Sequence, residues 1–225
     1  MDFYRMLSEG YDEIFPYSPD AGSLVKSFAP SGGLILDVGS ATGQYVKRYS
    51  RSGYKAYGLE YVPELVHFRE NTAVGDMTDL PFSPVFDVVS CMGNTLAHCR
   101  NYTHAENIVR GFYDVLKPQG TAVVQILNYH RILTVKPASL PEIRTEHYVF
   151  RRNYEYIKNH ISFKGVLKGG RQSRTSTVTL YPLTPRELLD AAMAAGFSFI
   201  EYMGSFKGAG FDMAEDFMLV AVLKK

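Results

Sequence analysis

Apolar runs in the first 130 residues predict the strands of a parallel sheet. Most of these runs carry Val, Ile or Leu at successive positions, so both faces of the strands are expected to be buried. The predicted strands cover residues 33–38, 55–60, 86–92 and 120–127, and two closing strands follow at 197–204 and 216–225. Segments with helical spacing lie between them at 42–53, 63–72, 104–120 and 184–197. This alternation of strand and helix predicts an α/β fold with a doubly wound sheet.

The pattern of polar and apolar residues along the chain changes after residue 130. Residues 146–157, 159–168 and 174–183 alternate polar with β-branched or aromatic side chains, and the stretch GVLKGGR offers a turn. An antiparallel sheet is therefore predicted within residues 131–182, inserted after the fourth strand. We expect it to project from the carboxyl edge of the parallel sheet, where open α/β folds bind ligands.

Composition narrows the class of protein without indicating a macromolecular partner. Of the 225 residues 46% are hydrophobic and 21% are charged, and the net charge is +1, so we expect neither nucleic acid nor a membrane as partner. The two cysteines, Cys91 and Cys99, are too few for a disulfide framework and lack metal-ligand spacing. The N-terminal stretch MDFYRMLSEGYDEIF is acidic, and no apolar run is long enough to span a membrane. We expect a cytoplasmic protein without a metal ion.

The first predicted strand runs into a turn of small residues, Asp37-Val38-Gly39-Ser40-Ala41-Thr42-Gly43. Small side chains at positions 39, 41 and 43 let the backbone approach a ligand, although an ordinary strand-to-helix connection has the same composition. A dinucleotide such as NAD requires Gly-x-Gly-x-x-Gly, but Ala41 and Gln44 stand where two of these glycines would be. Asp37 also lies where an acid can meet a cationic ligand. The turn therefore favours an adenosine-containing ligand other than a dinucleotide.

Together with later segments, this turn resembles motif I of class I S-adenosylmethionine-dependent methyltransferases, Glu/Asp-x-Gly-x-Gly-x-Gly, with Ala41 in place of the middle glycine. Glu60, at the end of KAYGLE, stands where this family binds the two ribose hydroxyls. Asp76-Met77 resembles the pair that reads the adenine, and FDVVSCMGN resembles the fourth-strand motif beside the methyl donor. The resemblance implies S-adenosylmethionine as cofactor and S-adenosylhomocysteine as product. It assigns cofactor contacts to Asp37, Gly39, Ser40, Ala41, Gly43, Glu60, Tyr61, Asp76, Met77, Cys91, Met92 and Gly93.

The resemblance also implies the complete fold. It predicts a Rossmann-like, seven-stranded mixed sheet whose last strand, around residues 216–223, runs antiparallel to its neighbours. We therefore expect residues 1–225 to form a single methyltransferase domain. Residues 1–30 are expected to form an N-terminal helical lid, and residues 131–182 an inserted β-rich lid over the substrate.

Two short stretches resemble a subgroup with small-molecule substrates. CMGNTLAH, residues 91–98, is similar to the Gly-Asn-Ser-x-x-His segment of glycine and sarcosine N-methyltransferases. LNYHRIL, residues 127–133, is similar to their Asn-Tyr-Asp-x-Ile-Leu segment, with His130 where that pattern has Asp. Gly93-Asn94-Thr95 occupies the place of the Asn-Pro-Pro-Tyr motif that is typical of enzymes acting on nucleobases or protein glutamine. A small molecule is therefore expected as substrate.

Candidate catalytic and substrate residues follow from the ends of the predicted strands. His98 has a titration range suited to a general base, and it also fits a capping or packing role. Asn94 is expected either to orient the cofactor or substrate, or to serve as a turn residue. Further candidates for substrate contacts are Tyr129 and Arg131 after the fourth predicted strand, and Tyr4 and Tyr11, whose rings equally fit core packing.

The inserted segment is basic. Residues 144–174 carry eight Lys or Arg side chains against two Glu side chains. The charge fits a solvated sheet face, or a lid in which Arg171 and Arg174 hold a carboxylate or phosphate of the substrate. RNA binding is a third interpretation, but the segment has no recognised RNA-binding motif.

These observations predict methyl transfer to a small, anionic metabolite that bears an amine or, as the next choice, a hydroxyl group. Two alternatives are a non-catalytic S-adenosylmethionine-binding regulator and an aminopropyl transferase on the same fold. The second would need an acidic pocket for a polyamine, whereas the inserted segment is basic. We expect a monomer or a homodimer.

Overall fold

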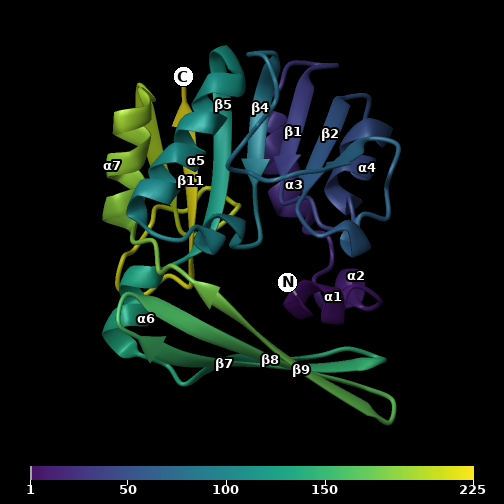
Figure 1. Ribbon diagram of the computed structural model, residues 1–225. Coiled ribbons are helices and arrows are strands. Elements are labelled where there is room, and N and C mark those ends of the chain that lie inside the picture. Colours follow the sequence, from purple (N-terminus) through teal and green to yellow (C-terminus); the bar gives the residue numbers. More distant parts are fainter. Residues whose placement is uncertain (1) are drawn as a thin grey trace.

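The computed structural model describes residues 2–225 as two β-sheets, sheet A and sheet B, with helices on both faces of sheet A (Figure 1). Sheet A comprises β1 (Leu34–Val38), β2 (Lys55–Glu60), β3 (Thr72–Val74), β4 (Phe86–Cys91), β5 (Leu116–Leu127), β10 (Phe199–Met203) and β11 (Met218–Lys224). Sheet B comprises β6 (Ser139–Arg144), β7 (Tyr148–Ile157), β8 (His160–Gly169) and β9 (Gln172–Leu180). The helices are α1 (Asp2–Leu7), α2 (Tyr11–Ile14), α3 (Pro19–Ser27), α4 (Gln44–Arg51), α5 (Tyr102–Val115), α6 (Tyr129–Val135) and α7 (Pro185–Ala195), and two 3-10 turns are η1 (Pro63–Leu65) and η2 (Thr95–His98).

Sheet A has the strand order β10-β11-β5-β4-β1-β2-β3. The five strands from β5 to β3 in this order pair in parallel, and β11 runs antiparallel to β5 and β10. The predicted seven-stranded mixed sheet with an antiparallel last strand is therefore confirmed. The strand order reverses between β1 and β4, and the carboxyl ends of these strands meet at the edge where such sheets bind ligands.

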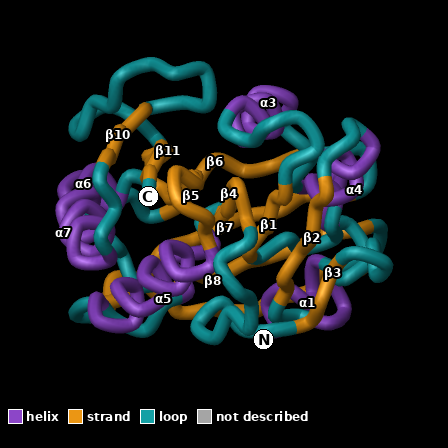
Figure 2. Tube along the Cα trace, turned by 90° about the horizontal axis from the view of Figure 1, so that it is seen from above, coloured by secondary structure: helices purple, strands orange, loops and turns teal. Residues whose placement is uncertain are grey.

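Side chains of each central strand alternate between two helical layers. Leu36 and Val38 pack in a hydrophobic cluster with residues of α5 and α7, whereas Ile35 packs in a second cluster with residues of α3 and α4. Figure 2 shows α5 and α7 on one side of the sheet and α3 and α4 on the other. Burial on both faces is the reason why these strands appear in the sequence as continuous apolar runs.

Sheet B lies beyond the carboxyl edge of sheet A, with α1 and α2 between the two sheets (Figure 1). Leu7 of α1 and Ile14 of α2 pack against Phe150 and Leu167 of sheet B, in a cluster separate from those of sheet A. α3 packs instead on the α4 face of sheet A. Of the residues predicted to form an N-terminal lid, only α1 and α2 lie over this edge.

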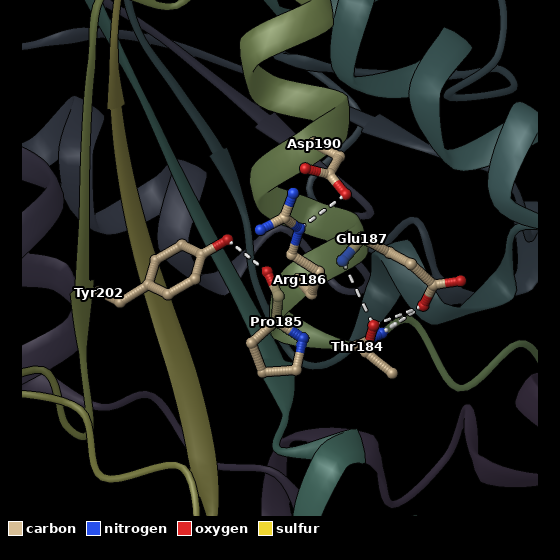
Figure 3. A network of polar contacts seen from close by, with 6 residues as sticks. All are labelled: Thr184, Pro185, Arg186, Glu187, Asp190 and Tyr202. Atoms are coloured by element: carbon tan, nitrogen blue, oxygen red, sulfur yellow. Dashed lines mark hydrogen bonds and ion pairs between the residues drawn. The ribbon is translucent and has the colours of Figure 1, made fainter.

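The start of α7 illustrates how local sequence fixes an element. Thr184 accepts a hydrogen bond from the backbone N–H of Glu187, and the Glu187 carboxylate accepts one from the N–H of Thr184 (Figure 3). Pro185 occupies the first turn, and its carbonyl accepts a hydrogen bond from the Tyr202 hydroxyl of β10. This capping box defines the start of α7, and Tyr202 joins it to the edge of sheet A.

Three local predictions are wrong. Residues 63–72 were predicted as a helix, but they form η1, an irregular segment and the start of β3. After η1 the chain becomes extended at Val66, and the Phe68 N–H donates to the carbonyl of Thr42 rather than to a helical partner. The inserted sheet begins at Ser139, because residues 129–135 form α6. β6 is an additional strand without the expected alternation.

Over residues 2–225, no helix combines the length and apolar character needed to cross a membrane. Within the same residues, no group of three or more His, Cys, Asp or Glu side chains is arranged to hold a metal ion.

Candidate functional site

A cavity of about 310 Å³ lies at the carboxyl edge of sheet A, between that edge and sheet B. Its walls come from the turns after β1, β2, β3 and β4, from α1 and α2, and from β9. Of the predicted cofactor residues, those that line it are Gly39, Ala41, Glu60, Tyr61, Asp76, Met77 and Gly93. Of the predicted catalytic and substrate residues, those that line it are His98, Tyr4 and Tyr11. Residues from four strand ends that are distant in sequence therefore face one space.

The small residues of the turn after β1 are required by its geometry. Gly39 and Gly43 have φ values of 73° and 78°, and Ala41 has a φ of 48°, which is unusual for a residue with a side chain. A Cβ atom on Gly39 would lie 2.4 Å from a methyl carbon of Thr95 in η2. The N–H groups of Gly39 and Ser40 donate to the Leu59 carbonyl, which fixes the turn against β2. The backbone can therefore approach a ligand closely at this point.

Glu60 holds the same turn from its other side. Its carboxylate is buried and accepts hydrogen bonds from the N–H of Ala41 at 2.8 Å and of Val62 at 2.9 Å. Burial raises the pKa of Glu60, while these backbone hydrogen bonds act to lower it. A carboxylate has about four acceptor positions, so acceptor positions remain for hydroxyl groups of a ligand in the cavity. Glu60 therefore fits the role of a ribose ligand.

Asp37 is buried behind the turn and does not line the cavity. The Ser90 hydroxyl donates to its Oδ1 at 2.7 Å. Burial raises the pKa of Asp37 to about 7, and the nearby Glu60 carboxylate adds to this effect, whereas the Ser90 hydrogen bond opposes it. Asp37 can therefore influence a ligand only through its electrostatic field and through the shape of the turn that it supports. No motif or charge pattern in the sequence singled out Ser90.

In the strand order β4-β1-β2-β3, β3 and β4 lie at opposite ends. The turn after β3 therefore forms the wall of the cavity on the other side from Gly93. Asp76 lines the cavity, and its Oδ1 accepts a hydrogen bond from the N–H of Thr78 at 2.9 Å. Met77 is half-buried and packs against the main core of sheet A. Tyr61 lines the cavity and is 50% exposed, so its ring lies at the cavity mouth.

Residues at the end of β4 and in the turn after it lie in two different environments. Gly93 lines the cavity, whereas Cys91 and Met92 are buried in the core and do not. Asn94 has a left-handed backbone, accepts a hydrogen bond from the Leu127 N–H and donates one to the Tyr129 hydroxyl. The Asn94 side chain therefore joins β4 to β5 and α6 instead of facing the cavity. The turn interpretation of Asn94 fits this arrangement, and a direct catalytic contact does not.

His98 and Tyr4 meet inside the cavity. The Nε2 atom of His98 lies 2.6 Å from the hydroxyl oxygen of Tyr4, and their rings pack edge to face. Burial lowers the pKa of His98 to about 4, so its imidazole is neutral near neutral pH. Burial also raises the pKa of Tyr4, which therefore keeps its proton. The ring is therefore unprotonated, but its Nε2 atom is already paired with Tyr4, and a pKa of about 4 makes it a weak base.

Four predicted substrate residues do not line this cavity. Tyr129 is completely buried beneath it, and Arg131 is half-buried on α6. Arg174 lines a second cavity of about 400 Å³ between α1 and the far end of sheet B, where it pairs with Glu9 at 3.3 Å. Arg171 lies exposed in the turn between β8 and β9 and lines neither cavity. Neither Arg171 nor Arg174 therefore lines the space beside the turn after β1, and their contact with a substrate stays a prediction.

Other lining residues escaped the sequence analysis. Arg100 and His104 follow η2 and line the cavity, as do Thr177 and Thr179 of β9. Arg100 lies two positions after His98, so the rule that ligands bind at strand ends could have found it. The threonines had no such signal, because their position depends on how sheet B folds over sheet A.

The α1–α2 segment is bonded to both sides of the cavity. Asp12 accepts a hydrogen bond from the Thr42 hydroxyl, and the Phe15 carbonyl accepts one from the Gln44 side chain at 2.8 Å. On the sheet B side, Glu13 accepts a hydrogen bond from the backbone N–H of His147 at 2.9 Å. The roof of the cavity therefore connects the turn after β1 with sheet B.

Comparison with protein families and curated proteins gives matches to methyltransferases. Residues 36–124 match a family model described as a methyltransferase domain. A dTDP-4-amino-2,3,4,6-tetradeoxy-D-glucose N,N-dimethyltransferase of Saccharopolyspora spinosa is 29% identical over 114 residues, which cover 45% of this chain and 43% of that protein. A dTDP-3-amino-3,6-dideoxy-alpha-D-glucopyranose N,N-dimethyltransferase of Streptomyces fradiae is 24% identical over 131 residues, which cover 55% and 51%. The chain spans about half the length of these curated relatives.

Solved structures resemble the chain over nearly its whole length. The CcbJ methyltransferase of Streptomyces caelestis aligns with a TM-score of 0.81 at 22% identity, covering 96% of this chain and 95% of that one. An S-adenosylmethionine-dependent methyltransferase of Clostridium acetobutylicum ATCC 824 aligns with a TM-score of 0.82 at 10% identity, covering 98% of both chains. CalS10, an amino pentose methyltransferase of Micromonospora echinaspora described with S-adenosylmethionine bound, has a TM-score of 0.66 at 18% identity and 95% coverage of both chains. At these identities the likeness shows a common fold.

Proposed function

We propose that this chain, which carries a methyltransferase domain and has the class I methyltransferase fold, transfers a methyl group from S-adenosylmethionine to an amino group of a small molecule. One observation carries the proposal: the turn after β1, Glu60 and Asp76 face a single cavity together with a neutral His98. The turn, Glu60 and Asp76 fit an adenosine-containing cofactor, and His98 fits a methyl acceptor that must lose a proton.

The proposed cofactor contacts follow the walls of the cavity. Glu60 would bind the ribose hydroxyls through its remaining acceptor positions, and Asp76 with Met77 would bind the adenine, with Tyr61 at the mouth. Gly39, Ala41 and Gly93 would lie along the methionine part. Asp37, Ser40, Gly43, Cys91 and Met92 would support these contacts from the core, since none of them lines the cavity. The missing Cβ of Gly39 and the close approach of Thr95 support a tight fit at this end.

When bound, S-adenosylmethionine supplies a methyl group already activated by its sulfonium. The protein then has to position the acceptor, exclude water and leave the lone pair of the nucleophile free. Tyr4, Tyr11 and sheet B cover the side of the cavity that faces away from sheet A, which supports the exclusion of water. His98 is proposed to take the proton released by the methylated amine and to pass it on to solvent, because its imidazole is unprotonated and lies in the cavity but is too weak a base to keep the proton.

The acceptor is proposed to be an amine of the amino-sugar type. Both curated relatives described above are named as N,N-dimethyltransferases of amino sugars bound to dTDP. The hydroxyl groups of Thr177 and Thr179 line the sheet B side of the cavity, which supports a polar acceptor with several hydrogen-bonding groups. The similarity of residues 91–98 and 127–133 to glycine and sarcosine enzymes stays a prediction, and we place it second for this reason.

Calorimetry with S-adenosylmethionine and with NAD tests the cofactor. We expect binding of S-adenosylmethionine, and a ten- to hundredfold loss of affinity in Glu60→Gln, since a charge-assisted hydrogen bond contributes about 1.5–3 kcal/mol. Glu64→Gln is the matched control, because Glu64 pairs with Arg5 outside the cavity. Tighter binding of NAD, or equal affinities of the two variants, would contradict the assignment.

Release of S-adenosylhomocysteine from a panel of free and nucleotide-linked amino sugars, amino acids and phenols tests the reaction. Turnover with amines is expected, with kcat reduced about 10²–10⁴-fold in His98→Asn if His98 acts as base. Turnover with phenols alone would assign O-methylation, and silence throughout the panel despite tight cofactor binding would favour a regulator. A His98→Asn variant with unchanged kcat and lower stability would leave His98 as a packing residue.

A further inference from the structure

The charges that line the main cavity are unequally distributed. Glu60 and Asp76 lie on the walls proposed for the cofactor, and Arg100 is the only Lys or Arg side chain among the described residues that line this space. The sequence placed a basic group over the substrate and assigned it to Arg171 and Arg174. The structure moves both of these side chains elsewhere and brings Arg100 to the cavity instead.

The backbone of Arg100 is fixed while its side chain is free. Its N–H donates to Nδ1 of His104 at 2.9 Å, and its carbonyl lies 2.8 Å from Nε2 of His160 in sheet B. Over residues 2–225, the guanidinium takes part in no intramolecular hydrogen bond or ion pair with a side chain or carbonyl. A guanidinium carries five donors, so this one can bind an oxyanion through two of them at once.

His104 adds a donor next to Arg100. Because its Nδ1 accepts the hydrogen bond from Arg100, the proton of the neutral ring lies on Nε2. Burial and then the charge of Arg100 lower the pKa of His104, while the nearby Asp76 carboxylate opposes this shift. His104 also lies in the first turn of the 14-residue α5, whose N-terminal end favours negative charge. Thr177 and Thr179 contribute hydroxyl donors from β9 in the same cavity.

Arg174 provides the contrast within the chain. It is also exposed and lines a cavity, but its guanidinium pairs with Glu9 and lies 3.3 Å from Gln172. An anion that binds Arg174 would have to displace a carboxylate of the protein, whereas an anion that binds Arg100 would not. Arg174 therefore serves as an internal control for a general effect of removing an arginine.

We propose that Arg100, assisted by His104, binds an oxyanion of the methyl acceptor and so makes the enzyme selective for amines that carry a carboxylate or phosphate. This proposal rests on the function proposed above for the same cavity. The acceptor amine lies near His98, and its anionic group lies at the cavity mouth near the start of α5. Arg100 is a specificity-determining residue in this arrangement and has no part in the transfer of the methyl group.

Thermal unfolding of the protein saturated with S-adenosylhomocysteine, titrated with inorganic pyrophosphate or with acetate, tests the proposal. Each anion that binds the folded protein raises Tm in a concentration-dependent way, from which an apparent Kd follows. The wild type is expected to bind, and Arg100→Gln is expected to weaken binding about ten- to a hundredfold. Arg100→Lys is expected to fall between them because Lys cannot bind in a bidentate manner, and Arg174→Gln is expected to match the wild type. Pyrophosphate alone raising Tm assigns a phosphate group, and acetate alone assigns a carboxylate.

Several results would overturn the proposal. They are the absence of any anion effect, equal effects in Arg100→Gln and the wild type, and an equal loss in Arg174→Gln. A loss of S-adenosylhomocysteine affinity in Arg100→Gln as large as the loss of anion affinity would instead make Arg100 a cofactor residue. Failure of the proposed function is a separate result, because wild-type protein would then gain no stability from S-adenosylhomocysteine. In that case the same anion titration without this ligand still decides whether Arg100 binds an oxyanion.

Discussion

The carboxyl edge of sheet A and the far end of sheet B hold their polar groups in different ways. At the carboxyl edge of sheet A, the carboxyl groups of Asp37 and Glu60 are buried and hydrogen-bonded by neighbouring protein groups. At the far end of sheet B, beside the second cavity, the Arg174 pair with Glu9 is exposed to solvent. Buried polar groups keep one geometry because breaking their hydrogen bonds is costly, whereas exposed pairs contribute little and rearrange readily.

This difference suggests a division between a fixed edge of sheet A and an adaptable sheet B. A cofactor with one chemical structure is best held by groups that are fixed before it binds. An acceptor side built from exposed strands and long side chains can change by substitution without disturbing sheet A. If this division is correct, substitutions should affect stability strongly at the edge of sheet A and weakly in sheet B.

The largest effect is expected for Glu60→Ala. The change leaves the N–H groups of Ala41 and Val62 buried without an acceptor, at a cost of about 1–3 kcal/mol each. We expect a loss of up to about 6 kcal/mol in the free energy of unfolding, measured by urea denaturation. Glu64→Ala removes an exposed partner of Arg5 and should cost less than about 1 kcal/mol. Similar losses of stability in the two variants would mean that buried and exposed carboxylates contribute alike, which would contradict the proposed division.

A pH dependence is expected from Asp37. Because burial raises its pKa to about 7, the folded protein keeps a proton that the unfolded chain releases at lower pH. This contribution to stability is complete below the unfolded pKa and is lost as pH rises through about 7. Asp37→Asn should remove a change on the order of 4 kcal/mol between about pH 4 and pH 8, as followed by denaturation at a series of pH values.

The Ser90 hydroxyl gives a second way to test the same carboxyl group. Its hydrogen bond lowers the pKa of Asp37, so Ser90→Ala should move the loss of stability to higher pH. Parallel pH profiles of wild type and Asp37→Asn would show that the carboxyl group of Asp37 is not the titrating group.

Asn94 is expected to have an intermediate effect. Asn94→Ala removes the hydrogen bonds to Leu127 and Tyr129, at about 1 kcal/mol each, and places a side chain without local hydrogen bonds at a φ of 67°. A total loss of about 3 kcal/mol is expected from denaturation. Asn94→Gly should be about 1 kcal/mol less destabilised, since glycine adopts this backbone without strain. If the alanine variant instead keeps its stability and loses cofactor affinity, the Asn94 side chain has a direct function in binding.

The smallest effect is expected in sheet B. Arg174→Gln removes an exposed pair with Glu9, and the free energy of unfolding should change by less than about 1 kcal/mol. The variant should also keep the affinity for S-adenosylmethionine, measured by calorimetry. A large loss of stability here would mean that the second cavity is part of the folded core rather than an adaptable surface.

The sequence contained enough information for most of sheet A. Strands buried on both faces appear as unbroken apolar runs, and acids such as Glu60 at their ends mark the edge where a ligand binds. It was insufficient where a distant contact decides the local structure. The segment after Leu65 has helical spacing, but the Phe68 N–H bonds to the Thr42 carbonyl, and β3 has only three residues.

The position of charged side chains was predicted less well than the strands. Counting charges along residues 144–174 selected Arg171 and Arg174, because they lie in a basic cluster. A two-stranded hairpin as long as β8–β9 carries its turn far from sheet A, so its charges reach a different space. Arg100 has no basic cluster around it, so counting charges missed it, and its signal was its position two residues after His98 beyond a strand end.

The position of β11 has a consequence for synthesis of the chain. β11 lies between β5 and β10 and pairs with both, yet it is the last strand of sheet A to leave the ribosome. Until then, β5 keeps an unpaired edge formed by an apolar sequence, which is a template for association with other chains. Nascent protein is therefore most exposed to aggregation in the interval between synthesis of β5 and synthesis of β11.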